Sequence, residues 1–84
     1  MTDLSNPDYW YFNRRDLAPG QVFRNADGDI VKLDRRVVGD GTRWEVATWL
    51  NGAWCYDQNE VEPGELRGAA IPDTPAAIEA ALAA

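Results

Sequence analysis

The chain has 84 residues and a formal net charge of −6, from 14 acidic and 8 basic side chains. Its hydrophobic fraction of 45% is that of a globular protein rather than a disordered one. This length predicts one small domain. The acidic balance argues against non-specific binding to nucleic acid or to a membrane, which needs clustered Lys and Arg.

Histidine is absent, and Cys55 is the only cysteine. The sequence therefore predicts no disulfide, no metal site and no cofactor. A serine or cysteine nucleophile normally needs a positioned base, usually histidine, so we predict no catalytic residues and do not expect an enzyme. No leader and no apolar run of the ~20 residues that span a membrane is visible. We expect a cytoplasmic protein of a bacterium or one of its viruses, in an oligomeric state that the sequence leaves open.

Residues 6–15 predict a short helix in an N-terminal arm that covers residues 1–18. Asn6 can cap this helix, and Pro7 suits its first position. Its body, 9–12, is four consecutive aromatic residues, which one helical face cannot hold. An extended segment is therefore the alternative.

Two strands are predicted next, over 21–25 and 29–38, joined by a glycine turn at 25–28 and followed by another at 39–42. Residues 23–34 come near the pattern of a calcium-binding loop. Its first ligand, however, would be Phe23, so the oxygen cage is incomplete. We therefore interpret Asp27-Gly28 as a plain Asp-Gly turn.

The segment 44–56 is the strongest signal in the chain, because Asn51-Gly52 lies between two apolar, aromatic runs. A two-residue turn fixes the register of the hairpin. The predicted pairs are Leu50 with Ala53, Trp49 with Trp54, Thr48 with Cys55 and Ala47 with Tyr56. Both faces of this hairpin are apolar, so one lines a core and the other is either covered or open to a partner.

The remainder predicts a polar segment at 57–60, a tight turn or 3₁₀ turn at 63–66 and a short strand at 67–71. A helix over 73–82 closes the chain, with Thr74 as its cap and Pro75 at its first position. Ile78 and Leu82 form its narrow apolar stripe.

Strands at 8–12-residue spacing with glycine turns are typical of a small barrel or sandwich. Residues 19–66 resemble the SH3-like barrels of the Tudor and KOW kind. The resemblance rests on Pro19-Gly20-Gln-Val-Phe23, the Asp27-Gly28 hairpin, Trp44-Glu-Val46 and Glu60-Val-Glu-Pro-Gly-Glu-Leu66. We therefore predict a mainly β protein, a small SH3-like antiparallel barrel of four to five strands with short N- and C-terminal helices. The arm is followed by the barrel at 19–71 and an alanine-rich helix at 72–84. The predicted core consists of Phe23, Val31, Leu33, Trp44, Val46, Leu50 and Leu66.

The hairpin face with Trp49, Trp54 and Tyr56 is the first candidate binding site. Tudor-like and SH3-like barrels use such aromatic surfaces for cationic or proline-rich peptides. The alternative is that the aromatic segment 9–12 docks on this face and makes it structural, and we expect this outcome.

The acidic residues Asp57, Glu60, Glu62 and Glu65 form the second candidate, an acidic rim that engages a basic partner. A solvated charged loop is its alternative. The expected function is a non-catalytic protein-interaction or accessory module that binds another protein. The alternatives are an acidic inhibitor of a nucleic-acid-binding protein and a nucleic-acid-binding barrel, against which the net charge counts.

Overall fold

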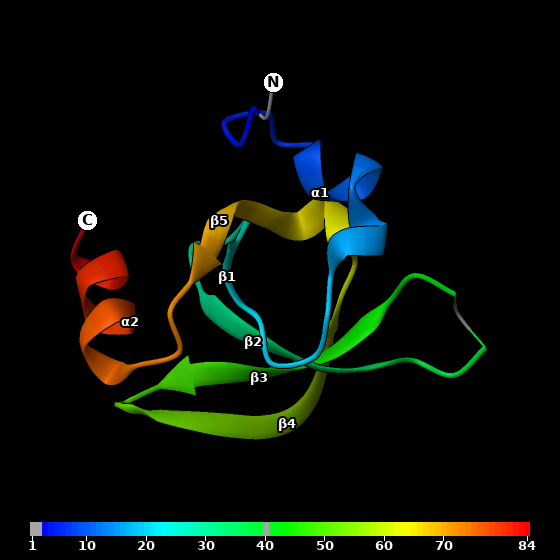
Figure 1. Cartoon of the computed structure of the whole chain (residues 1–84). Coiled ribbons are helices and arrows are strands. Elements are labelled where there is room, and N and C mark those ends of the chain that lie inside the picture. The colour runs from blue at the N-terminus through cyan, green and yellow to red at the C-terminus, as the bar shows by residue number, and fades with distance from the viewer. Residues whose placement is uncertain (1–2, 40) are drawn as a thin grey trace.

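The computed structural model describes residues 3–39 and 41–84, so the predicted turn at 39–42 and the start of the N-terminal arm lie partly outside the described residues. The described chain is mainly β, with one five-stranded antiparallel sheet and short helices near its ends (Figure 1). In chain order the elements are α1 (Tyr9–Phe12), the 3₁₀ turn η1 (Arg14–Asp16), β1 (Val22–Asn25), β2 (Ile30–Arg36), β3 (Trp44–Leu50), β4 (Ala53–Val61), the 3₁₀ turn η2 (Pro63–Glu65), β5 (Leu66–Ile71) and α2 (Pro75–Ala83). The strand order is β4-β3-β2-β1-β5. The sheet is open, because its outer strands β4 and β5 do not pair within the described residues.

The turn of the β3–β4 hairpin is Asn51-Gly52, as predicted. Asn51 has φ 52° and Gly52 has φ 81°, the two left-handed values that a type I′ turn requires. The predicted pairs Leu50 with Ala53, Trp49 with Trp54 and Thr48 with Cys55 are confirmed. Local turn chemistry therefore sets this part of the register.

The predicted pair of Ala47 with Tyr56 is wrong. After Thr48 and Cys55 the next paired residues are Val46 and Asn59, so two steps along β3 match four steps along β4. This irregularity includes Gln58, whose φ of 63° is left-handed. An insertion of this kind is a β-bulge, which bends the strand and re-aims its side chains. Strand β4 continues with the shifted register through the predicted polar segment and ends at Val61.

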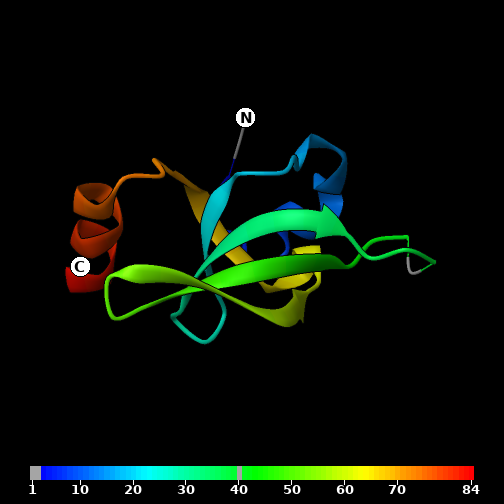
Figure 2. The same ribbon diagram turned by 90° about the horizontal axis from the view of Figure 1, so that it is seen from below.

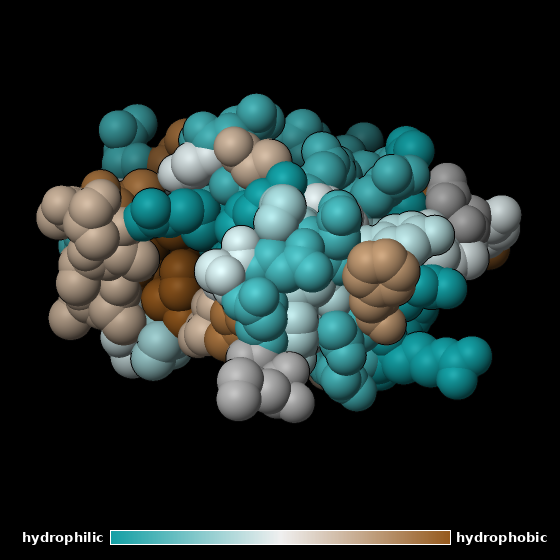
Figure 3. Space-filling view, turned by 90° about the horizontal axis from the view of Figure 1, so that it is seen from above, coloured by the Kyte–Doolittle hydropathy of each residue, from teal (hydrophilic) through white to brown (hydrophobic). Residues whose placement is uncertain are grey.

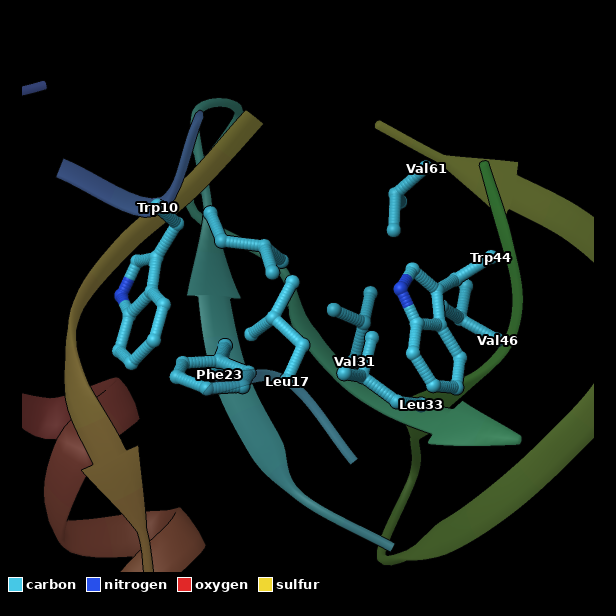
Figure 4. Packing of buried hydrophobic residues seen from close by; sticks show 9 residues of the cluster. Trp10, Leu17, Phe23, Val31, Leu33, Trp44, Val46 and Val61 are labelled. Carbon is cyan, nitrogen blue, oxygen red and sulfur yellow. The ribbon is translucent and has the colours of Figure 1, made fainter. Parts of the chain in front are cut away.

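Apolar residues form one cluster on each face of the sheet, because neighbouring strand residues point to opposite faces. The larger cluster, shown in Figure 4, consists of Trp10, Leu17, Phe23, Val31, Leu33, Trp44, Val46, Val61 and Leu66. The smaller one consists of Val22, Ile30, Trp49 and Ile78. Six of the seven predicted core residues are buried, whereas Leu50 is 46% exposed. Leu50 directly precedes the turn and therefore projects beyond the packed part of the sheet.

The aromatic segment 9–12 forms a single helical turn rather than the longer predicted helix. This turn directs Trp10 inward, where its ring packs against Phe23 with centroids 5.0 Å apart. The indole Nε1 of Trp10 also donates a hydrogen bond to the main-chain oxygen of Gly68 at 2.8 Å. Tyr11 and Phe12 remain exposed, because one helical face cannot bury four successive aromatic residues.

The N-terminal arm does not cover the tryptophan face of the hairpin, which corrects the docking prediction. Both ribbon views place α2 beside the hairpin tip and α1 toward the opposite end of the sheet (Figures 1 and 2). Ile78 of α2 is fully buried in the smaller cluster, next to Trp49. From above, hydrophobic residues gather over α2, while hydrophilic residues cover most of this side of the molecule (Figure 3).

Thr74 caps α2 as predicted, because its hydroxyl oxygen accepts a hydrogen bond from the Ala77 N–H at 3.2 Å. We expect Thr74→Ala to lower the free energy of unfolding by about 1 kcal/mol, the usual cost of losing an N-cap. Chemical denaturation monitored by circular dichroism measures this loss. Thr74→Ser keeps the hydroxyl and is the control. An equal loss in both variants would contradict the capping role.

Candidate functional site

The structure separates the three residues of the predicted aromatic site. Trp49 is 9% exposed and Trp54 is half-buried, whereas Tyr56 is 63% exposed. The two indole rings pack edge to face, with centroids 5.1 Å apart. The Trp49 Nε1 donates to Glu79 Oε1 of α2 at 3.3 Å. Trp49 is therefore part of the packing under α2, and only Tyr56 presents most of its ring to solvent.

An internal cation already occupies the face of Trp54. Lys32 Nζ lies 4.7 Å from the centroid of the Trp54 ring and 3.1 Å from Asp73 Oδ2. The other carboxylate oxygen of Asp73 accepts a hydrogen bond from Trp54 Nε1 at 3.2 Å. Because Lys32 supplies the cation–π contact, Trp54 does not form an empty cage for the cation of a ligand.

The four side chains of the predicted acidic rim have different partners. Glu60 and Glu62 each form an ion pair with Arg43, with nitrogen–oxygen distances of 3.3 Å. Glu62 and Glu65 form the capping box of η2. Asp57 accepts a hydrogen bond from Asn59 Nδ2 at 3.0 Å. Of these four acidic residues, only Glu60 and Glu65 line a pocket that the structure reveals between the β1–β2 turn and the end of β4.

This acidic pocket has a volume of about 210 Å³, and carboxylates from three separate segments surround it. Asp27 and Asp29 come from the β1–β2 turn, Glu60 comes from β4 and Glu65 comes from η2. Its remaining lining consists of Asn25, Val31, Val46, Thr48, Asn59 and Val61. The exposed carboxylates thus form an acidic mouth of the pocket, and the buried valines form a partly apolar floor.

The β1–β2 turn holds its carboxylates in place through Asn25. The side-chain oxygen of Asn25 accepts hydrogen bonds from the main-chain N–H groups of Asp27, at 3.0 Å, and Asp29, at 2.9 Å. Such side-chain to main-chain bonds fix a turn locally. The sequence pattern of this segment indicates only a turn, so Asp27 and Asp29 were not predicted as pocket residues. Their role depends on the bulge in β4, which no local pattern signals.

Cations do not neutralise the turn side of the pocket. Within residues 3–39 and 41–84, neither Asp27 nor Asp29 forms an ion pair. Arg35 is engaged elsewhere, with Glu45 on β3, and this hydrogen bond raises the pKa of its guanidinium. The turn side of the acidic pocket therefore carries two carboxylates that no cation of the described residues neutralises.

A buried indole N–H lies near the floor of this pocket. Trp44 is 1% exposed, and its Nε1 has no hydrogen-bond partner among the described residues. Figure 4 shows this nitrogen on the edge of the ring that faces Val31 and Val61. Both valines also line the acidic pocket. An unpaired buried donor of this kind costs about 1–3 kcal/mol of stability.

The described part of the chain contains no group of three or more Cys, Asp or Glu side chains that could hold a metal ion. In the same part, no helix has both the length and the apolar character needed to cross a membrane. The chain matches no protein-family model, no curated protein and no solved structure.

Proposed function

We propose that this chain is a non-catalytic protein-interaction module, built on an SH3-like fold, that binds a basic segment of a partner protein at the acidic pocket. The observation that carries the proposal is the convergence of Asp27, Asp29, Glu60 and Glu65 around one hollow. The strand order β4-β3-β2-β1-β5, with the last strand beside the first, supports the SH3-like assignment.

The chemistry of the pocket favours a lysine or arginine side chain over a metal ion or a neutral ligand. The carboxylates attract the charged end of such a side chain, while Val31, Val46 and Val61 can contact its aliphatic stem. Exposed ion pairs are worth only about 0–1 kcal/mol each, so several contacts must act together. The net charge of −6 adds long-range attraction that accelerates association.

Basic segments also occur on proteins that bind DNA or RNA, because those surfaces contact phosphates. A module that occupies such a surface would block the nucleic-acid-binding protein. An acidic inhibitor of that kind is therefore one form of the proposed interaction module. Direct nucleic-acid binding is the competing proposal, and the field at Asp27 and Asp29 opposes it. Adding a labelled single-stranded oligonucleotide to the binding assay distinguishes the protein-interaction module from a nucleic-acid-binding protein. If the proposal is right, the basic peptide binds and the oligonucleotide does not.

We expect the double variant Asp27→Asn/Asp29→Asn to weaken binding of a labelled peptide, Lys-Arg-Lys-Thr-Val-Thr-Val, by about tenfold, which corresponds to ~1.4 kcal/mol. The loss follows from removing the unpaired carboxylates of the pocket. Fluorescence anisotropy at two salt concentrations measures both affinity and its electrostatic part.

The matched control is Asp8→Asn/Asp16→Asn, which removes the same charge from exposed positions in and next to the N-terminal helical turns. It should change the affinity by less than about twofold, because neither residue lines the pocket and exposed charges contribute little individually. Equal losses in the two double variants would show that net charge alone attracts the peptide, and would refute the pocket.

A further inference from the structure

Strand β4 forms one edge of the open sheet and pairs only with β3 within the described chain. In a type I′ hairpin, the two residues that flank the turn exchange both main-chain hydrogen bonds. These residues are Leu50 and Ala53. The following pair, Trp49 and Trp54, is consequently a pair without hydrogen bonds. The main-chain N–H and C=O of Trp54 point away from β3, toward the open edge.

The N–H of Tyr56, two residues further along β4, also faces the open edge. It shares a peptide unit with the carbonyl of Cys55, which points toward Thr48 on β3, and the two groups of a trans peptide point in opposite directions. Of the residue, 63% is exposed. No loop or side chain of the described residues bonds the main chain of Trp54 or Tyr56. The edge therefore offers the N–H groups of Trp54 and Tyr56 as donors and the carbonyl of Trp54 as an acceptor.

Proteins usually protect such edges with charges, prolines or bulges. In β4 these features lie only in the second half of the strand, where Asp57, Glu60 and the left-handed Gln58 occur. The first half, 53–56, carries no charge and no proline. An unprotected half next to an acidic half is suited to a strand that is basic at one end and uncharged at the other.

We propose that the open edge of β4 at Trp54 and Tyr56 accepts an extended basic segment of the partner as an additional antiparallel strand. This inference rests on the proposed function and specifies how the partner binds. Glu60 belongs both to β4 and to the acidic pocket, so the same strand carries the open edge and part of the pocket. A second copy of the chain is disfavoured as the occupant, because each copy carries a charge of −6.

Antiparallel addition also fixes the polarity of the partner. Its N-terminal residues lie near Asp57 and Glu60, and its C-terminal residues lie near Trp54, because the new strand runs opposite to β4. Basic residues should therefore precede uncharged β-branched residues in the bound segment. The peptide Lys-Arg-Lys-Thr-Val-Thr-Val has this order.

The decisive variants are Tyr56→Pro and its matched control Tyr56→Ala. Both remove the exposed ring, but only proline removes the outward N–H, and proline is tolerated at strand edges. We expect Tyr56→Pro to weaken peptide binding by about tenfold and Tyr56→Ala by less than about threefold, because main-chain bonds provide the affinity in strand addition. Equal losses in the two variants would overturn the inference.

A second measurement does not depend on the folding of a variant. The same peptide, N-methylated on alternate residues, keeps its charges but loses the N–H groups on one edge. We expect this peptide to bind the unaltered protein about tenfold more weakly when the methylated edge is the pairing edge, because strand addition requires those N–H groups. If neither methylation pattern weakens binding while Asp27→Asn/Asp29→Asn still does, strand addition is wrong and the acidic pocket stands. If the unmodified peptide does not bind at all, both proposals fail.

Discussion

Replacing Trp44 with alanine should lower the free energy of unfolding by about 3–5 kcal/mol, the range for truncating a buried tryptophan. Trp44 is 1% exposed and belongs to the larger cluster, where it contacts residues from several strands (Figure 4). Small domains have total stabilities near the low end of about 5–15 kcal/mol, so this loss would unfold a large share of the molecules. Urea denaturation followed by circular dichroism measures the change.

Trp44→Phe is the control, because it keeps an aromatic ring but removes the unpartnered Nε1. Removing an unsatisfied buried donor recovers about 1–3 kcal/mol, which offsets part of the packing loss. The phenylalanine variant should therefore lie within about 1.5 kcal/mol of the parent, in the range for well-tolerated apolar exchanges. A Trp44→Ala protein that melts within a few degrees of the parent would contradict the core assignment. A phenylalanine variant as unstable as the alanine variant would show that the indole N–H has an acceptor.

Replacing Ile78 with alanine should lower the free energy of unfolding by about 2–5 kcal/mol and release α2 from the sheet. A helix of this length is marginal in isolation and depends on its docked residues. Ile78 is the only buried residue of α2 and is fully buried. Its loss should expose Trp49, so the tryptophan emission maximum should move to longer wavelength along with the fall in stability.

Leu82→Ala is the matched control on the same helix, since Leu82 is 43% exposed. Surface substitutions usually change stability by less than about 0.5 kcal/mol. Deleting residues 1–17 is a second comparison, because it should uncover Phe23 and Leu66 while Trp49 stays covered by α2. Equal effects of Ile78→Ala and Leu82→Ala would refute the docking of α2.

The acidic pocket illustrates what a sequence pattern cannot supply. Asp27 and Asp29 are ordinary turn residues, and Glu60 belongs to a segment that reads as a polar loop. The bulge that includes Gln58 shifts the β3–β4 register, so that Glu60 lies opposite Glu45 on β3 and lines the pocket with the two turn residues. The energy of a bulge depends on both strands and on the core beneath them, so the residues of one strand do not encode it alone.

The sequence by itself determined the features whose energy is local. The turn at Asn51-Gly52 requires left-handed backbone, and the cap at Thr74 requires a side-chain oxygen three residues before an N–H. Tertiary structure decided which terminal segment covers which face. Both the arm and α2 offer apolar side chains, and the hairpin is apolar on both sides, so the local pattern permits either arrangement. In the folded chain Trp10 packs on Phe23, and Ile78 packs against Trp49. The hydrophobic effect is non-directional, so each terminal segment buries its apolar side chains against the face that it reaches.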